Sequence, residues 1–162
     1  MPIQVGAEAP DFELESSELV DGKPGKKIRL SEYRGKKNVV LAFYPLDFSP
    51  VCSKENECFR EDLSELEKSG GQGTQLLGIS VDSKWAHFAF AKQMGLKYPL
   101  LADFNPRGEV ASKYGLYLAD KGITARATVI VDRAGKVAWV KVQEIPEARD
   151  DKQILAELRK LA

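Results

Sequence analysis

The chain has 162 residues, close to the usual size of one domain, so residues 1–162 are expected to form a single unit with its own core. Its 24 basic residues balance its 24 acidic residues, which gives no electrostatic reason to expect nucleic acid or a membrane surface as a partner. No apolar run approaches the roughly 20 residues that span a bilayer, and residues 1–6 do not resemble a secretory signal, so a cytoplasmic location is expected.

The first half of the chain predicts strands followed by one long helix. Gly, Pro and charged residues gather at residues 21–27, which indicates a turn between two short N-terminal strands. Residues 38–44 are nearly all apolar and rich in β-branched and aromatic side chains, which predicts a central strand covered on both faces. A loop with two prolines follows, and then apolar residues recur at helical spacing from Cys52 to about residue 68.

The second half alternates between strands and helices. Strands are predicted at residues 75–81 and 98–102, helices at 84–94 and from 106 to about 114, a hairpin at 127–131 and 137–142, and a last helix at 150–161. Such alternation implies parallel strands with crossover helices, and the late hairpin implies an antiparallel addition. The sequence therefore predicts an α/β fold in which a mixed central sheet is flanked by helices and preceded by an N-terminal hairpin.

Cys52 is the first candidate for chemistry because it follows the predicted strand at residues 38–44 and begins a helix. Functional groups in such folds collect at the carboxyl ends of the strands. A helix N-terminus offers unpaired N–H groups and a partial positive charge, and both favour the reactive thiolate over the thiol. Two cysteines do not make a secreted disulfide framework, and in a reducing compartment such a pair is more often catalytic or metal-binding.

The residues that precede Cys52 form a more specific motif. Residues 45–52 read PLDFSPVC, which is the pattern P-x-x-x-[ST]-x-x-C between a buried strand and a helix, and here the sequence resembles the peroxiredoxins. The resemblance covers nearly the whole chain and includes residues 6–12, 30–36 and 126–132; around Cys52 it is similar to the branch with one-cysteine and bacterioferritin-comigratory-type members. It implies a thioredoxin-like fold and a thiol-dependent peroxidase that reduces hydrogen peroxide and organic hydroperoxides through a sulfenic acid on Cys52.

The resemblance also implies a role for each matching residue. Cys52 is the peroxidatic cysteine, Ser49 hydrogen-bonds to the peroxide and the thiolate, Pro45 shields the thiolate from water, Arg126 is the active-site arginine, and Glu55 orients Arg126. Physical chemistry is consistent with these roles, because a guanidinium stabilises both a thiolate and a departing oxygen, and a hydroxyl donates and accepts at once. Taken singly, each residue has an ordinary structural interpretation; their order along the chain favours the functional one.

Cys58 is the candidate resolving cysteine. It lies six residues after Cys52, which on a helix separates the side chains by about 120° and about 9 Å of rise, whereas a disulfide needs Cα atoms within about 7 Å. The pair can therefore form only if the first turns unwind. Peroxiredoxins that resolve within one helix place the second cysteine five residues on, so two alternatives stay open: Cys58 resolves, with a thioredoxin- or glutaredoxin-like reductant, or an external thiol resolves Cys52 and Cys58 is structural.

The remaining features give weaker indications. His87 is the only histidine, and we interpret it as a polar position on an amphipathic helix rather than as the partner of Cys52, with Trp85 and Phe88 as packing residues. No glycine-rich nucleotide motif is present, so no flavin or nicotinamide cofactor is predicted, and two cysteines with one histidine do not supply a tetrahedral metal site. The family resemblance implies a homodimer, with the loop that carries Phe48 as the candidate contact.

Two other functions are weighed against the peroxidase. A thioredoxin-like thiol-disulfide oxidoreductase requires C-x-x-C at the start of the helix, and Glu55 stands where the second cysteine would be. A redox-regulated chaperone on the same fold remains an alternative, because fold does not determine function.

Overall fold

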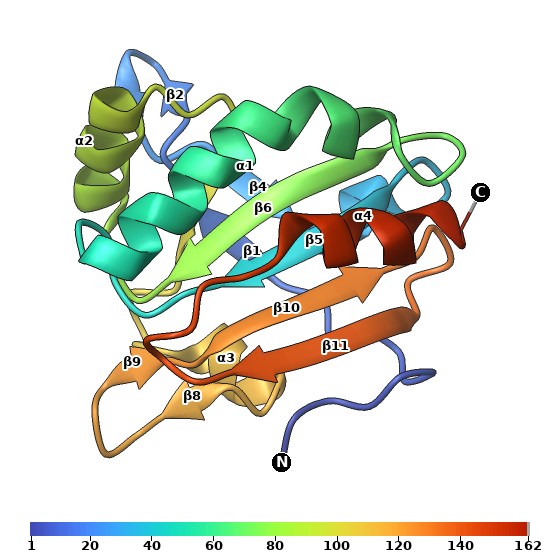
Figure 1. Ribbon diagram of the computed structural model, residues 1–162. Helices are drawn as coiled ribbons and strands as arrows, with labels where there is room; N and C mark the ends of the chain where they lie inside the picture. Colours follow the sequence, from blue (N-terminus) through green and yellow to red (C-terminus); the bar gives the residue numbers. More distant parts are fainter. Residues whose placement is uncertain (162) are drawn as a thin grey trace.

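The computed structural model describes residues 1–161 and contains one five-stranded mixed sheet with the order β11-β10-β5-β6-β7 (Figure 1). The strands β5 (Asn38–Phe43), β6 (Thr74–Ser80) and β7 (Leu100–Ala102) are parallel. The strand β10 (Arg126–Val131) is antiparallel to β5 and to its hairpin partner β11 (Val137–Gln143). The predicted mixed α/β sheet is therefore confirmed, with its parallel part where helices make the crossovers.

Helices lie on both faces of this sheet. Three of them, α1 (Pro50–Lys68), α2 (Lys84–Met94) and α4 (Asp151–Arg159), pack on one face, and α1 and α4 cross in front of the sheet in Figure 1. The short helix α3 (Glu109–Lys113), the 3₁₀ helix η1 (Leu30–Tyr33) and the N-terminal segment cover the other face. Every residue of β5 is buried, which explains why its sequence is a continuous apolar run rather than an alternating one.

Six short strands complete the fold outside the main sheet. β1 (Glu13–Glu15) pairs with β4 (Lys27–Arg29), β2 (Leu19–Val20) with β3 (Lys23–Pro24), and β8 (Tyr117–Leu118) with β9 (Ile123–Thr124). The prediction of one turn across residues 21–27 was too long, because parts of that segment are extended. The chain reverses at Asp21 and Gly22, which both adopt positive φ angles, and this gives the predicted N-terminal hairpin.

Some helix boundaries differ from the predicted ones for local reasons. α1 begins at Pro50, two residues earlier than predicted, because proline fits the first helical position, where no N–H partner is needed. α3 begins at Glu109 instead of residue 106, after Gly108 in the left-handed conformation. The Asp103 carboxylate accepts the N–H groups of Val110 and Ala111 at 3.0 and 2.9 Å, which supplies the partners that this helix start lacks.

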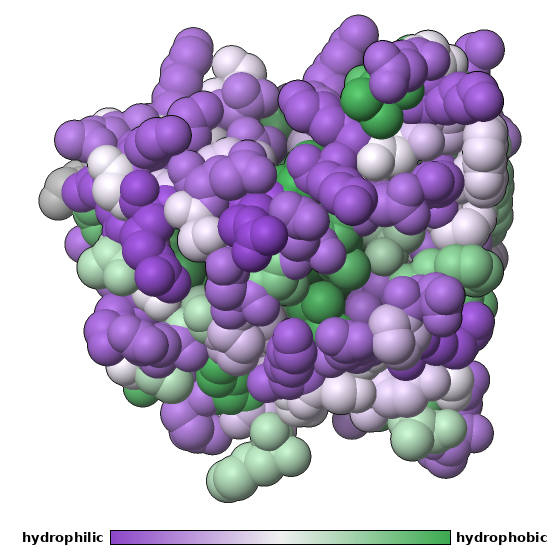
Figure 2. Space-filling view, turned by 180° about the vertical axis from the view of Figure 1, so that it is seen from behind, coloured by the Kyte–Doolittle hydropathy of each residue, from purple (hydrophilic) through white to green (hydrophobic). Residues whose placement is uncertain are grey.

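The surface of the side opposite to Figure 1 is mostly hydrophilic, with small apolar patches between charged groups (Figure 2). Among the helices of residues 1–161, none combines the length and the apolar character that a bilayer crossing requires. The unusual polar and charged groups of this protein lie in the interior of the fold.

Candidate active site

Cys52 lies in the first turn of α1, at the edge of the sheet where β5 ends. Ser49 is the N-cap residue and Pro50 the first helical residue, and the Ser53 N–H donates to the Ser49 carbonyl at 2.8 Å to close the first turn. The thiol has no exposed surface. It is thus a buried sulfur held at the positive end of a 19-residue helix, where negative charge is stabilised.

Arg126 brings a cation to this sulfur. It is the first residue of β10, and the pairing of Ala127 with Phe43 places it at the end of β5, beside the start of α1. Its Nη2 lies 3.4 Å from Cys52 Sγ, its Nη1 forms an ion pair with Glu55, and its Nε donates to the Ile145 carbonyl at 2.7 Å. All three nitrogens have partners, so the guanidinium is fixed in one orientation.

Arg149 is a second buried arginine at the site, and the sequence did not reveal it. Its backbone N–H donates to Glu55 Oε2 at 2.8 Å, and its Nε lies 3.6 Å from the same oxygen. Its Nη1 donates to the Ala127 carbonyl at 2.6 Å and its Nη2 to the Phe43 carbonyl at 2.5 Å, so it connects the last loop to β10 and β5. Burial lowers the pKa of Arg149, while the Glu55 carboxylate opposes that shift. No periodic or cap pattern around residue 149 could have identified it.

The charges of this cluster do not balance when Cys52 is a thiol. Arg126 and Arg149 supply two positive charges, and Glu55 supplies one negative charge. The side chains of all three are at most 2% exposed, so water does little to offset the excess. A buried net charge is costly unless it is paired. A negative charge on the Cys52 sulfur would balance this cluster, which suits the site to chemistry that develops negative charge there.

The loop of residues 45–49 carries the other two predicted residues. Pro45 is buried two residues after the end of β5, and Ser49 is partly exposed at the start of α1. The Ser49 hydroxyl donates to the Leu46 carbonyl at 3.1 Å in this structure. Its oxygen keeps lone pairs that can accept a hydrogen bond from a bound ligand.

Cys58 lies on the same continuous helix as Cys52, and both thiols are free. It is partly buried. Burial raises the pKa of the Cys58 thiol, and the nearby carboxylates of Asp151, Glu61 and Asp62 raise it further, while Lys54 opposes them. Cys58 is therefore held as a thiol in the folded helix.

His87 was predicted to occupy a polar position on an amphipathic helix. In the structure its side chain is fully buried and contacts Asp47 and the Leu101 carbonyl. Trp85, expected to pack in the interior, is 58% exposed. The face of α2 that packs inward carries His87 and Phe90, three positions apart. The hydropathy of this helix is therefore a poor guide to its buried face.

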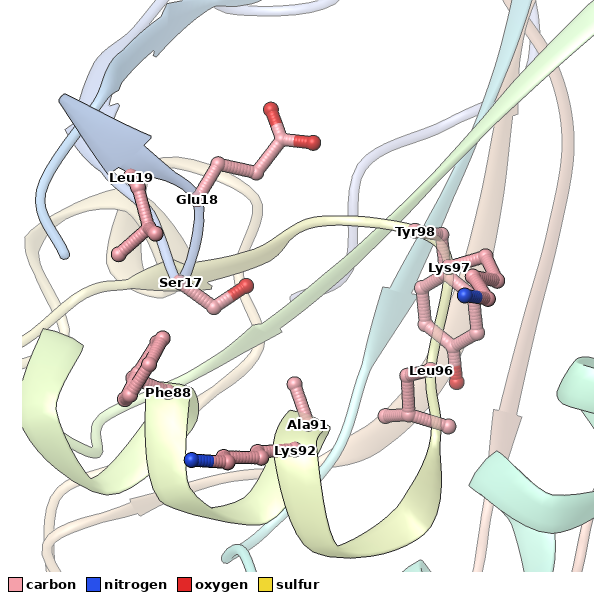
Figure 3. A pocket seen from close by; sticks show the side chains of 9 residues that line it. All are labelled: Ser17, Glu18, Leu19, Phe88, Ala91, Lys92, Leu96, Lys97 and Tyr98. Carbon is pink, nitrogen blue, oxygen red and sulfur yellow. The ribbon is translucent and has the colours of Figure 1, made fainter. Parts of the chain in front are cut away.

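A groove of about 400 Å³ lies between the N-terminal hairpin and α2 (Figure 3). Its lining combines apolar side chains with hydroxyl groups and charges of both signs, and consists of Ser17, Glu18, Leu19, Phe88, Ala91, Lys92, Leu96, Lys97 and Tyr98. None of these residues belongs to the Cys52 cluster. The groove is therefore separate from the candidate active site.

Comparison with known proteins finds a matching family, related sequences and a similar solved structure. Residues 5–140 match the AhpC/TSA family. Alkyl hydroperoxide reductase E of Mycobacterium tuberculosis is 37% identical over 150 residues, which cover 93% of this chain and 92% of that protein. Peroxiredoxin-2 of Mus musculus is 39% identical over 153 residues, which cover 90% and 73%. The solved structure of Mycobacterium tuberculosis AhpC superposes with a TM-score of 0.85 at 27% identity and covers 99% of both chains.

The mixed sheet and the buried thiol beside a guanidinium define a thiol-dependent oxidoreductase of the thioredoxin-like fold. Within that class, the chain belongs to the AhpC/TSA family, the peroxiredoxins, as the resemblance around Cys52 predicted. It is accordingly a thiol-dependent peroxidase.

Proposed function

We propose that Cys52 is the nucleophile of this peroxidase and that Arg126 and Glu55 form its electrostatic machinery. The Cys52 thiolate attacks one oxygen of the peroxide, the O–O bond breaks, and the sulfur becomes a sulfenic acid. The other oxygen leaves with negative charge and takes up a proton, which gives water or an alcohol. The observation that carries this proposal is the 3.4 Å separation of Arg126 Nη2 and Cys52 Sγ in a site closed to solvent.

The arginine acts through charge that is already in place before the reaction. A fixed guanidinium stabilises negative charge on sulfur in the ground state and on the departing oxygen in the transition state, without the reorganisation that water would need. Glu55 holds Arg126 in this orientation. Ser49 hydrogen-bonds to the bound peroxide, and Pro45 adds no competing N–H donor beside the sulfur.

Resolution by Cys58 is the second part of the proposal. The Cys58 thiol attacks the sulfenic sulfur, the S–O bond breaks, and a disulfide and one water molecule form. A thioredoxin- or glutaredoxin-like dithiol then reduces the disulfide and is itself oxidised. Both cysteines lie on α1, so the first turns of this helix must unwind for the bond to form.

The finer identity of the protein is also proposed. The segment around Cys52 and the placement of both cysteines on one helix favour the branch with one-cysteine and bacterioferritin-comigratory-type members. Hydrogen peroxide and organic hydroperoxides are the proposed substrates, in line with the alkyl hydroperoxide reductase that is 37% identical. We propose a homodimer formed by the loop with the exposed Phe48, and a cytoplasmic location for a single domain of residues 1–162.

Stopped-flow consumption of hydrogen peroxide by the reduced protein tests the nucleophile. We expect a rate orders of magnitude above that of a free thiol, lost in Cys52→Ser and retained in Cys58→Ser. A wild-type rate equal to that of a free thiol would remove Cys52 from the mechanism. Mass spectrometry after one equivalent of peroxide tests the resolving step: a stable sulfenic acid without a disulfide would leave resolution to an external thiol.

A further inference from the structure

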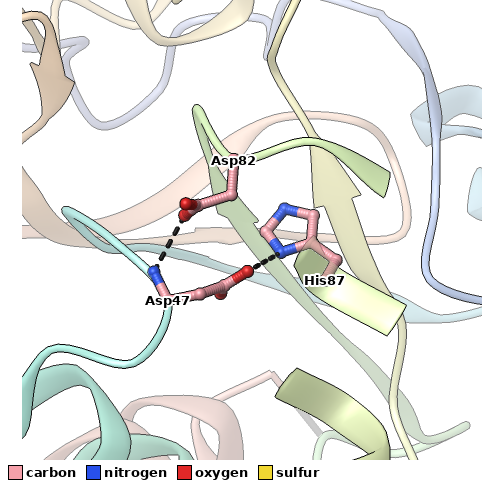
Figure 4. A group of neighbouring side chains, drawn as sticks. All are labelled: Asp47, Asp82 and His87. Atoms are coloured by element: carbon pink, nitrogen blue, oxygen red, sulfur yellow. Dashed lines mark hydrogen bonds and ion pairs between the residues drawn. The ribbon is translucent and has the colours of Figure 1, made fainter. Parts of the chain in front are cut away.

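A second buried polar network lies beside the loop that precedes α1 (Figure 4). It joins Asp47 of this loop, Asp82 after β6, and His87 of α2. His87 Nδ1 is 2.7 Å from Asp47 Oδ2, and the Asp47 N–H donates to Asp82 Oδ2 at 2.8 Å. The reaction proposed above gives none of these residues a role, although His87 and Asp47 are almost completely buried.

Both ring nitrogens of His87 have hydrogen-bond partners. Its Nε2 lies 2.9 Å from the Leu101 carbonyl oxygen, which can only accept a hydrogen bond, so Nε2 carries a proton. Asp47 Oδ1 accepts from the Tyr44 hydroxyl at 2.5 Å, and Oδ2 faces His87 Nδ1. One proton between Nδ1 and Oδ2 therefore joins the two side chains in a buried hydrogen bond, and the Tyr44 hydroxyl lies 3.5 Å from the same Nδ1.

The other charged group of the network, Asp82, stabilises the loop rather than the imidazole. Its Oδ2 accepts from the Asp47 N–H and from the Ser80 hydroxyl, the latter at 2.5 Å. The atoms of Asp47, Asp82 and His87 that face one another thus already make hydrogen bonds. The group is a hydrogen-bonded network that connects the loop to the end of β6, to α2 and to β7.

The loop needs such an anchor because its backbone is strained. Phe48 has a φ angle of 68°, which is unfavourable for an aromatic residue. Such a conformation persists only where the surrounding structure holds it. The Phe48 ring also packs edge-on against Phe90 of α2, with the ring centroids 5.0 Å apart. Two contacts from α2, one hydrogen bond and one aromatic contact, therefore hold the loop that leads into the first turn of α1.

We propose that the hydrogen-bonded Asp47–His87 pair is a positioning pair for the peroxidase reaction. It keeps the first turn of α1 wound, so that Cys52 faces Arg126, and its release permits the unwinding that brings Cys52 to Cys58. The second half of this statement rests on the proposed resolving role of Cys58. Weakening the pair is expected to slow peroxide reduction and to accelerate disulfide closure, two changes of opposite direction.

The hydrogen bonds of His87 can be measured in the unmodified protein, because the chain has one histidine. In ¹⁵N-labelled protein, we expect a one-bond N–H coupling at Nε2 and slow exchange of this proton with solvent, because Nε2 lies 2.9 Å from the buried Leu101 carbonyl oxygen. A ring proton that exchanges as fast as that of a free histidine would overturn the buried network. The measurement needs no variant and does not depend on any activity.

The positioning role is tested with His87→Gln and Asp47→Asn in a Cys58→Ser background. We expect the rate of peroxide reduction to fall about 10- to 100-fold, the effect of losing one charge-assisted hydrogen bond. Amide hydrogen exchange of residues 45–52 should accelerate by a similar factor. Tyr114→Phe is the matched control, because it removes a 2.7 Å hydrogen bond to the Pro10 carbonyl on the other face of the sheet. If the test variants behave like this control, the proposal is wrong.

Further experiments distinguish failure of the positioning role of Asp47 and His87 from failure of the resolving role of Cys58. In chains that retain Cys58, His87→Gln should close the disulfide faster after one equivalent of peroxide, and slower closure would refute the second half of the proposal. If the wild type forms no disulfide, the resolving role fails, while hydrogen exchange still tests the anchoring of the loop. If His87→Gln and Asp47→Asn do not fold, Tyr44→Phe is the substitute, because it removes a hydroxyl that donates to Asp47 and lies 3.5 Å from His87 Nδ1. A several-fold increase in exchange of residues 45–52 is then expected.

Discussion

Replacing Arg126 by glutamine tests whether the buried guanidinium drives peroxide reduction. Two unit charges separated by 3.4 Å, the distance from Arg126 Nη2 to Cys52 Sγ, interact with roughly 5 kcal/mol at an effective dielectric constant of about 20. The glutamine amide recovers part of this energy as a neutral hydrogen bond. Since about 1.4 kcal/mol corresponds to a factor of ten, we expect the rate constant for peroxide to fall about 100- to 1,000-fold.

The charge balance of the site also predicts that Arg126→Gln reacts more slowly with peroxide. Without Arg126, the Arg149 guanidinium neutralises Glu55, and a Cys52 thiolate becomes an unpaired buried charge. The variant should still fold, because Glu55 keeps its 2.8 Å hydrogen bond from the Arg149 N–H. Arg126→Lys keeps the charge, but the lysine ammonium cannot contact Glu55, the Ile145 carbonyl and Cys52 at the same time. An intermediate rate is therefore expected.

The assay is stopped-flow reduction of hydrogen peroxide under single-turnover conditions, with circular dichroism to verify the fold. Arg159→Gln is the control, since this arginine is exposed on α4 and pairs with Glu65 on the surface. Its rate should equal that of the wild type. A folded Arg126→Gln protein that reacts within tenfold of the wild type would refute the electrostatic argument.

Three further variants probe stability. Arg149→Gln should lower the unfolding free energy by about 3–5 kcal/mol, because it breaks a buried ion pair with Glu55; a loss below about 1 kcal/mol in urea would contradict this. Burial, together with a hydrogen bond that the protonated Asp151 donates to Asp62, raises the pKa of Asp151 from 3.8 to about 8, so the folded state retains a proton that the unfolded chain releases, and stability falls as pH rises from about 4 to about 8. Asp151→Asn should flatten that fall by about 1–2 kcal/mol, a value discounted for solvent screening, and an unchanged pH profile would exclude this origin. Gly78→Ala should cost about 1–3 kcal/mol in thermal unfolding, because its Cβ would lie 2.7 Å from Leu100 Cδ2; an unchanged midpoint would show that Leu100 can move away.

The elements around Cys52 could be predicted from local sequence. The apolar run of β5, the helical spacing of α1 and the Ser83 and Gly95 caps of α2 are properties of neighbouring residues, and the structure has them within two residues of the expected places. The position of Cys52 in the first turn of α1 followed from the same patterns. The peroxiredoxin resemblance then named Arg126 and Glu55, which lie 71 residues apart in sequence and meet in the structure.

The burial of His87 and the position of Arg149 beside Glu55 depend on tertiary packing and could not be predicted from the sequence. His87 reaches Asp47 across 40 residues, and Arg149 reaches Glu55 across 94, so no local spacing relates either pair. Their positions depend on the order of the strands and on how α2 and the last loop pack against the sheet. The main strands and helices and the reactive thiol could be predicted from the sequence, because periodicity, caps and the Cys52 motif are local. The fold determined which charges surround that thiol, because burial and ion pairing arise only when distant segments pack together.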